Sequence, residues 1–515
     1  MRLFSAPGCH APRLRGLLLA GCGAVVLTGC AVGPNYKQPA PPAVPRFTEK
    51  PMPDSTQRAE EAYGRAQHFA IGADVAGEWW TLFHSPRLSR MIADALRQNP
   101  SIEAAQQTLH QAQETTLAAE GSFFPQVTGT LNRQRQKFSP AQSGISPATR
   151  GFTGIPAFSV YTAQLGVSYT FDIWGQTRRT VEADAAQAEY QRSELEGAIT
   201  MLAANTATAA INAAALKEEV EAEQKLVTAE ANLLKVVRQQ FELGGATGTD
   251  VATQEAQLAN TQTLVVPLQT QYMQARDQLA AYLGRVPSVA DVPDISLDEL
   301  TLPGEVPVSL PSQLVAQRPD IRASAAQLHV ATAQVGVAVA NRLPQLTLSA
   351  FVGSAPAAIG DLFTPGNGFW SLTNQLAGPL FEGGTLLHQQ RAAVAAMKVA
   401  AANYQNTVIT AFQNVADALT ALSQDALALQ AAQAGERAAA RSLSLAQMQY
   451  GFGGVAYLTV LTTQTQYQNA VITLIRARAA RYSDTVALIA ALGGGWWNRN
   501  DVAPPPEGLM RSLLP

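Results

Sequence analysis

Strict alternation of apolar and polar residues marks one stretch in the first half of the chain. Its apolar positions are Tyr161, Ala163, Leu165, Val167, Tyr169 and Phe171, and small or polar residues fill most positions between them. This period of two predicts the second strand of a hairpin with one apolar and one polar face. An ordinary sandwich strand shows such alternation, and so does a transmembrane barrel strand, which is apolar outside and polar inside. A looser alternation predicts a second hairpin, with apolar positions Leu346, Leu348, Ala350 and Val352 on one strand and Trp370, Leu372 and Leu376 on the other.

Each hairpin is followed by a long stretch without helix breakers. Residues 176–242 and 385–450 contain no proline and one glycine each. Each stretch predicts a helix of about 100 Å at 1.5 Å per residue. Seams of apolar positions at spacings of three, four and seven predict coiled-coil-like packing. They are Leu226, Leu233, Val237 and Phe241 in the first long helix, and Ile475, Ala479, Tyr482, Val486 and Ile489 in the final helix.

Shorter helices are predicted beside the long ones. Both long helices end at glycines and are followed by helices over 249–283, with a kink at Pro267, and over 458–492. Another helix is predicted over 86–121, with Ser85-Pro86 at its start. Two short helices stacked end to end match one long helix in length. The pattern therefore predicts a tall cylinder.

The second half of the chain repeats the first. Asn99-Pro100 and Pro125-Gln126 match Arg318-Pro319 and Pro344-Gln345, in each case 219 residues later. Gly175, Gly244-Gly245 and Leu283-Gly284 match Gly384, Gly453-Gly454 and Leu492-Gly493, in each case 209 residues later. The difference of ten residues falls in the first hairpin. A register held over about 200 residues indicates one architecture built twice.

The three cysteines, Cys9, Cys22 and Cys30, all lie near the start of the chain. A basic segment with Arg2, Arg13 and Arg15 precedes an apolar stretch that ends in Leu27-Thr28-Gly29-Cys30, which looks like a bacterial lipobox. Cys22 ends a similar string, but only six residues separate it from Arg15, against 14 for Cys30. We therefore expect residues 1–29 to be a lipoprotein signal peptide. Cys30 would carry the covalent lipid, an N-acyl and an S-diacylglycerol group, and Ala31 after it favours the outer membrane in lipoproteins of this kind.

The same patterns predict where the parts of the mature chain begin and end. The predicted parts are an extended, Pro-rich, lipid-anchored segment over 30–77, the first repeat over 78–283, a Pro-rich linker over 284–310, the second repeat over 311–497 and an irregular tail over 498–515. No mature segment has 18 uninterrupted apolar residues, so no transmembrane helix is predicted.

Charge and side-chain chemistry argue against catalysis. Charged residues make up 15% of the chain and the net charge is -3, so nothing favours nucleic-acid binding. The six histidines lack metal-ligand spacing, and His110 and His329 occupy equivalent helix positions, which favours a structural role. Residues 244–249 superficially resemble a phosphate loop but lack its lysine, which favours a helix end and turn. Glu218, Glu219, Glu221 and Glu223 favour a solvated helix face over a cation site. We expect a non-enzyme without metal or cofactor other than the lipid.

Five strings carry a family resemblance over nearly the whole mature chain. They are Cys30–Tyr36 (CAVGPNY), Trp79-Trp80 with Pro86-Arg87-Leu88, Gln317–Arg322 (QRPDIR), Gly378–Gly384 (GPLFEGG) and Leu492–Trp496 (LGGGW). Together they resemble the outer-membrane factors of tripartite efflux pumps, the TolC-like family in its lipoprotein, NodT/RND-type branch. The resemblance implies a mixed α and β fold, in which a trimeric outer-membrane β-barrel of four strands per chain and twelve in total continues into a long periplasmic α-helical barrel. Oligomerisation is expected on physical grounds alone, because four strands cannot close a barrel and unpaired strand edges are costly in lipid.

The resemblance also implies a function. The homotrimer would be the exit duct for drugs or other small molecules, anchored in outer-membrane lipid. It would work with a periplasmic adaptor protein and an inner-membrane RND-type transporter. The turns at Gly244, Gly245, Gly453 and Gly454 would form the periplasmic tip where the adaptor docks. Candidates for the gate at this tip are Leu458, Leu461, Asp250 and Thr462, although helix-core packing suits the two leucines equally well.

Two alternatives stay open at this point. The outer-membrane duct of a type I protein secretion system shares the fold. A lipoprotein coiled-coil scaffold would need no pore, and the alternation over 161–171 argues against it.

Overall fold

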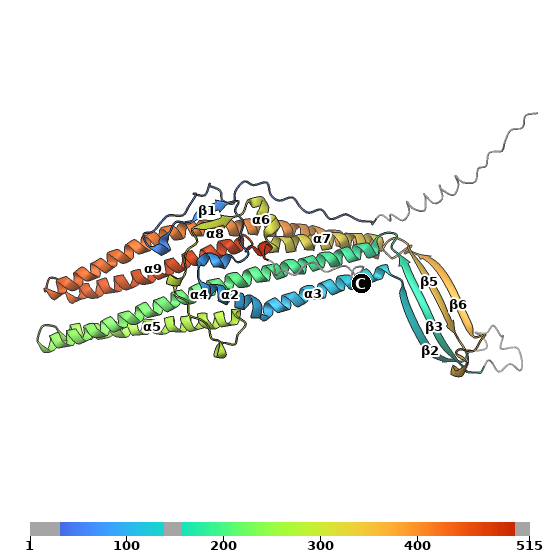
Figure 1. Cartoon of the computed structure of the whole chain (residues 1–515), viewed down its shortest axis with the longest axis horizontal. Helices are drawn as coiled ribbons and strands as arrows, with labels where there is room; N and C mark the ends of the chain where they lie inside the picture. Colours follow the sequence, from blue (N-terminus) through green and yellow to red (C-terminus); the bar gives the residue numbers. More distant parts are fainter. Residues whose placement is uncertain (1–30, 139–155, 500–515) are drawn as a thin grey trace, which may run out of the picture.

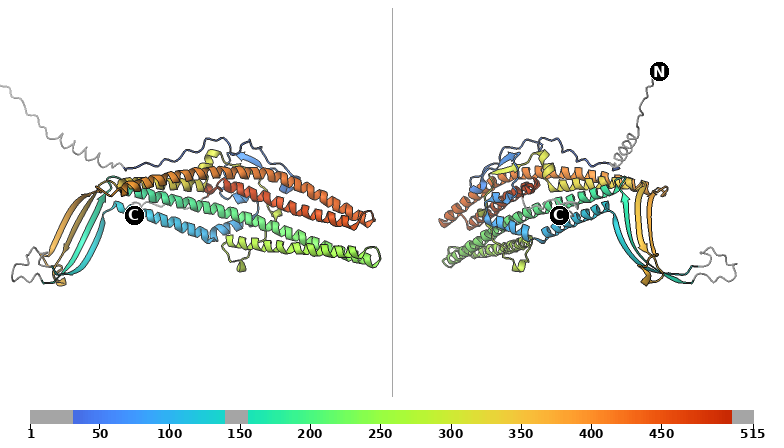
Figure 2. Two further views of the ribbon diagram at one scale, coloured as in Figure 1. Left: turned by 180° about the vertical axis from the view of Figure 1, so that it is seen from behind. Right: turned by 45° about the vertical axis from the view of Figure 1, so that its right-hand side comes forward.

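The computed structural model describes residues 31–138 and 156–499. The protein is an elongated helical bundle with a β-sheet at one end and two helix turns at the other (Figure 1). The sheet is set at an angle to the helices in both views of Figure 2. The lipobox cysteines and the tail from residue 500 lie outside the described residues.

The α-helices occur in the same order in both halves. They are α2 (Pro86–Gln98), α3 (Pro100–Glu120), α4 (Gln176–Glu242) and α5 (Gly248–Tyr282), then α6 (Pro311–Gln317), α7 (Pro319–Ala340), α8 (Thr385–Gly451) and α9 (Tyr457–Ala491). Short 3-10 helices are η1 (Ala62–Gly64), η2 (Trp79–Phe83), η3 (Gly121–Phe123), η5 (Pro287–Val289), η6 (Leu297–Glu299), η7 (Ile359–Asp361) and η8 (Trp496–Asn498). The strands are β1 (His68–Ile71), β2 (Gln126–Gln136), β3 (Phe158–Phe171), β4 (Glu305–Val308), β5 (Gln345–Ser354) and β6 (Gly368–Ala377).

The two long helices confirm the prediction from the missing helix breakers. Helices α4 and α8 have 67 residues each, and α5 and α9 have 35 each. Helices α3 and α5 follow one another along α4, and α7 and α9 do so along α8 (Figures 1 and 2). Helix α5 continues through Pro267. By length and composition α4 could cross a membrane, but 67% of its most apolar window is buried inside the bundle.

The single helix predicted over 86–121 is in fact two helices. Asn99 is extended between α2 and α3 because the ring of Pro100 disfavours helical backbone before it. The Asn99 side chain joins two helix ends: its Oδ1 accepts a hydrogen bond from Ser101 N (2.9 Å), and its Nδ2 donates to Tyr282 O at the end of α5 (2.8 Å). We call this contact the first joint. Gly284 closes it at φ +71°, where an added Cβ would lie 2.6 Å from Gln98 O.

The second half has an equivalent joint with different chemistry. Arg318, the counterpart of Asn99, donates from Nη1 to Ala491 O at the end of α9 (2.8 Å). Its guanidinium also pairs with Asp320 at 2.6 Å. Both joints therefore tie the start of one short helix to the end of another, which is how the short helices stack along the long ones.

The sheet at the end of the bundle is antiparallel, with strand order β2-β3-β5-β6. Cross-strand pairs such as Val127 with Val167, Leu165 with Val352 and Ala350 with Leu372 place the predicted apolar positions on one face. The opposite face carries mainly Thr, Ser, Gln and Gly. The predicted alternation is thus confirmed, and in the described part of the chain β2 and β6 are the sheet edges.

The main apolar core lies midway along the bundle. Strands β1 and β4 pair in parallel there, although they come from the N-terminal segment and from the segment predicted as a linker. Leu297, Leu302 and Val306 of that segment are buried in the core with Trp79 and Tyr482. Residues 284–310 therefore include a paired strand and buried core residues.

Candidate functional site: the helix-turn tip and the anchor cradle

The two long helices end in turns of the same geometry at one end of the molecule (Figure 1). Gly244 and Gly453 have φ values of +76° and +72°, in the left-handed region where glycine avoids the cost of a Cβ. The next amides turn back to the helix: Gly245 N donates to Gln240 O (2.7 Å) and Gly454 N donates to Gln449 O (2.8 Å). This pattern is a Schellman helix end. The predicted turns are confirmed, and residues 244–249 form no phosphate loop.

The helices that follow the two turns start differently. Thr247 and Asp250 form a capping box, in which Asp250 N donates to Thr247 Oγ1 (3.2 Å) and the Asp250 carboxylate accepts from Thr247 N (2.8 Å). The hydrogen bonds from Thr247 lower the pKa of Asp250. Ala456, the equivalent cap of α9, offers no side-chain hydrogen bond. Side-chain hydrogen bonds therefore stabilise the helix start after the first turn but not the one after the second.

The candidate gate residues separate into exposed and buried positions. Leu458 is 67% exposed, whereas Leu461 is buried in a small apolar cluster with Val237 and Tyr457. Thr462 is exposed, and its hydroxyl donates back to Leu458 O (2.9 Å). Of the two leucines, only Leu458 is thus free to face a neighbouring chain.

Two apolar residues at the tip were missed from the sequence. Leu243 is 88% and Phe452 is 91% exposed, each directly before the left-handed glycine of its turn. The sequence did contain a signal for them, because a large apolar residue stands directly before the turn glycines in both copies. The few residues of a tight turn cannot bury a side chain of that size.

A line of buried acidic residues runs along α4 above the tip. Glu219 pairs with Arg476 at 2.9 Å, and Glu223 accepts from Gln468 Nε2 at 2.7 and 2.6 Å. Glu230 is fully buried and accepts from Gln257 (3.2 Å) and Gln464 (3.4 Å). The expectation of a solvated face was therefore wrong for Glu219 and Glu223, which bind α9. We use the name acidic seam for Glu219, Glu223 and Glu230 with their partners on α9, Arg476, Gln468 and Gln464.

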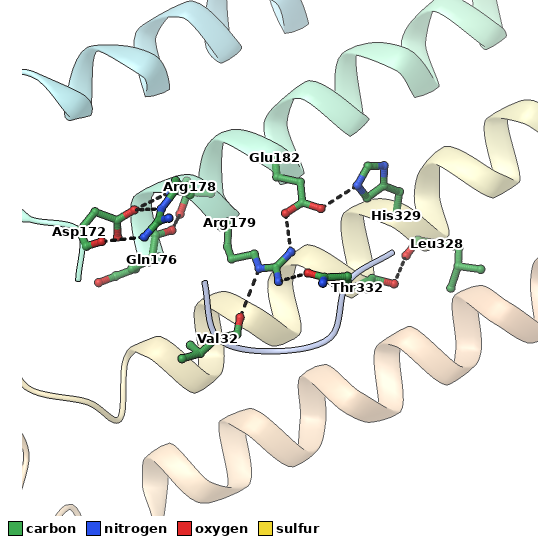
Figure 3. A network of polar contacts seen from close by, with 11 residues as sticks. Val32, Asp172, Gln176, Arg178, Arg179, Glu182, Leu328, His329 and Thr332 are labelled. Atoms are coloured by element: carbon green, nitrogen blue, oxygen red, sulfur yellow. Dashed lines mark hydrogen bonds and ion pairs between the residues drawn. The ribbon is translucent and has the colours of Figure 1, made fainter. Parts of the chain in front are cut away.

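A second polar network lies where α4 begins beside the sheet (Figure 3). Asp172, just after β3, accepts hydrogen bonds from the amides of Thr177 (2.9 Å) and Arg178 (3.0 Å) in the first turn of α4. Buried Arg179 points toward the N-terminal segment and donates to Val32 O (3.2 Å) and Asn35 Oδ1 (2.6 Å). It also pairs with Glu182 at 2.7 Å. We call the surroundings of Arg179 the anchor cradle.

The second repeat completes the anchor cradle from α7. His329 lies 2.9 Å from Glu182, and its ring stacks on Tyr36 with centroids 4.2 Å apart. Gly33 and Gly336 approach so closely that a Cβ on Gly33 would lie 2.5 Å from Gly336 Cα. Burial by itself would raise the pKa of Glu182, but the hydrogen bond to His329, the hydrogen bond to Arg179 and the charges of both partners together lower it. The expected structural role of His329 is thus confirmed, while His110 is an exposed residue 3.9 Å from Glu114.

The anchor cradle fixes where the described chain begins. Val32 N donates to Trp174 O (3.0 Å). A Cβ on Gly175 would lie 2.7 Å from Ala31. Cys30 lies outside the described residues, but its neighbour Ala31 therefore sits at the boundary between β3 and α4.

Comparisons with known proteins agree on one family. A family model described as "Outer membrane efflux protein" matches residues 91–285 and 310–494. The pyoverdine export outer membrane protein OpmQ of Pseudomonas aeruginosa is 30% identical over 84% of this chain and 90% of its own length. The probable efflux pump outer membrane protein TtgC of Pseudomonas putida is 29% identical over 95% of this chain and 97% of its own. The CmeC outer membrane channel of Campylobacter jejuni shares the fold, with a TM-score of 0.79 at 21% identity over 92% of this chain and 97% of that chain.

Proposed function

The chain is a member of the outer membrane efflux protein family, and on that premise we propose how its parts form an exit duct. It is the outer-membrane channel of a tripartite efflux system and passes drugs or other small molecules to the exterior. The family is one of ducts rather than of enzymes. One observation carries the proposal: a sheet with an apolar face and two open edges lies at one end of helices of about 100 Å.

The open edges support a homotrimer. Edges β2 and β6 would expose unpaired backbone groups in lipid, where each costs several kcal/mol. Three chains joined edge to edge would close a twelve-stranded barrel, within the range known for bacterial barrels. The four strands of this sheet have 10 to 14 residues each, enough to span the hydrocarbon layer. Their apolar face would contact lipid and their polar face would line the lumen.

The anchor cradle supports lipidation at Cys30. Because Ala31 packs against Gly175, between β3 and α4, the described chain begins at the level where the proposed barrel would meet the periplasmic helices. A lipid on Cys30 would enter the inner leaflet of the outer membrane there without stretching the chain. The barrel and the acyl chains would then hold the protein at the same depth in the membrane.

The tip supports the periplasmic partners. We place the contact with an adaptor protein at the turns around Gly244-Gly245 and Gly453-Gly454, where Leu243 and Phe452 are exposed without intramolecular cover. Energy would come from an inner-membrane RND-type transporter. Around the threefold axis, Leu458 would supply an apolar constriction and Asp250 and Thr462 polar positions. Leu461 would support this constriction from the helix core.

Photocrosslinking from the tip in living cells tests this arrangement. A photoreactive residue at Leu243 or Phe452 should capture an adaptor protein. The matched control at Ile359, which is exposed at the opposite end of the molecule, should capture none. Equal capture from both ends would refute the proposed docking. Separately, the purified protein should give discrete single-channel currents in planar bilayers. Failure to conduct, even with the tip leucines replaced by serine, would refute the duct itself.

A further inference from the structure

Two aromatic residues interrupt the polar face of the sheet between its two ends. In the described strands, the apolar residues on this face are Phe158, Val160, Phe351, Phe369 and Ala377, and the remaining positions are Thr, Ser, Gln, Asn or Gly. Phe158 and Val160 lie at the strand end remote from the helices, and Ala377 lies at the helix end. Phe351 and Phe369 lie between these ends, about 20 Å along β5 from Gln345 in the case of Phe351. We call these two residues the aromatic platform.

Each phenylalanine of the aromatic platform stands opposite a glycine. Phe351 pairs with Gly166 on β3, and Phe369 pairs with Gly353 on β5. A Cβ built on Gly166 would lie 2.7 Å from Phe351 Cε1 and 2.8 Å from Cδ1, so the ring lies down against the bare backbone of β3. A ring lying on the strand presents its face, not its edge, to the space in front of the sheet. The Phe351 ring therefore covers a glycine, which stabilises the strand, and its π-face points inward.

The two rings are close enough to act together. Phe351 is opposite Ser371 and Phe369 is opposite Gly353, so the two residues are diagonal neighbours on the same face. Diagonal neighbours lie about 7–8 Å apart, within reach of one aromatic ligand. The hydroxyls of Thr128 and Ser371 border the platform, and Thr128 Oγ1 would be 3.2 Å from a Cβ on Gly166. No charged side chain occupies this face of the described strands.

We propose that the aromatic platform is a binding site in the lumen for aromatic organic cations in transit. The face of a phenyl ring carries negative electrostatic potential, which attracts cations, and it also stacks on other rings. Three copies around the proposed barrel would bring six rings to one level of an otherwise polar lumen. The inference deepens the proposed function and depends on it, because only the closed trimer turns this face into a lumen.

Blockade of single channels by a matched pair of cations tests the proposal. Tetraphenylphosphonium and tetrabutylammonium carry the same charge, but only the first has rings. Added from the side of the strand ends remote from the helices, tetraphenylphosphonium should block wild-type currents for longer. Replacing both phenylalanines by leucine keeps the apolar bulk but removes the π-faces. In this variant the duration of blockade by tetraphenylphosphonium should shorten roughly tenfold, to that of tetrabutylammonium. The single variant Phe351→Tyr, which keeps the ring, should retain most of the wild-type blockade.

The outcomes separate the two proposals. Unblocked conductance and trimer yield on gels show that each variant folds, and Thr373→Ser on the same face is the matched control that should change nothing. Equal blockade by the two cations in the wild type, or blockade that persists in the double leucine variant, would overturn the platform while the duct stands. A protein that never conducts, even with the tip leucines replaced by serine, would overturn the duct and the platform together.

Discussion

The first joint offers a direct measurement of how one side chain links two stacked helices. Asn99 caps α3 through its Oδ1 and holds the end of α5 through its Nδ2. A lost N-cap costs about 1 kcal/mol, and a lost neutral hydrogen bond also costs about 1 kcal/mol. Asn99→Ala removes both interactions, for a total of about 2 kcal/mol. Asn99→Ser keeps a good cap and removes only the donor to Tyr282 O, for about 1 kcal/mol.

Hydrogen exchange measured by mass spectrometry resolves these costs locally. Amide protection in the first turn of α3 reports the free energy of opening there. It should fall about fivefold in Asn99→Ser and about thirtyfold in Asn99→Ala, in line with the two energies. The equivalent first turn of α7, held by Arg318, is an internal control and should keep its protection. Unchanged exchange in Asn99→Ser would refute the idea that the bond to Tyr282 holds the joint.

Three further predictions concern other parts of the chain. Burial and the neighbouring Asp484 carboxylate raise the pKa of Asp425 to about 7. The contribution of this carboxyl to stability is therefore fully present below its usual pKa of 3.8 and is lost as the pH rises through about 7. Asp425→Asn should reduce the dependence of the melting temperature on pH between about pH 5 and 8. An unchanged pH dependence would contradict this. Leu461→Ala should lower the free energy of unfolding by about 2–5 kcal/mol, measured by thermal unfolding. The exposed variant Leu458→Ala should change it by no more than about 0.5 kcal/mol, and the reverse ranking would contradict the assignment of core and tip. Arg179→Lys should speed chymotrypsin cleavage after Tyr36, because one ammonium cannot replace the guanidinium contacts to Val32, Asn35 and Glu182; equal rates would exclude this role.

The fold was predictable wherever the decisive pattern is local. The bounds predicted for α4 match the structure, because a long stretch without proline and with a single glycine leaves a helix few places to end. The hairpins were predictable from alternation, because a strand with two different faces needs a period of two. The break between α2 and α3 was missed because Pro100 was not recognised as a first-turn proline preceded by the capping residue Asn99. That signal was present in the sequence.

The candidate tip was predictable in position but not in detail. Glycine pairs mark both turns, because only glycine adopts positive φ without strain. Which leucine is core and which is exposed depends on Val237 of α4, more than 200 residues away from Leu461 in sequence. Periodicity on α9 alone cannot resolve this, because the two leucines lie three positions apart and share a helix face.

The acidic seam shows why a run of like charges was misread. Successive residues on a helix point about 100° apart, so four glutamates within six positions cannot share one face. Glu219 and Glu223, four positions apart, share the face toward α9, and Glu230 follows about two turns later. Their partners on α9 descend in number, from Arg476 to Gln468 to Gln464, as the α4 residues ascend. The contacts are therefore the rungs of one antiparallel register. A shift of either helix would leave buried carboxylates without partners, so the seam fixes the vertical register of the two repeats, which apolar packing alone would specify less strictly.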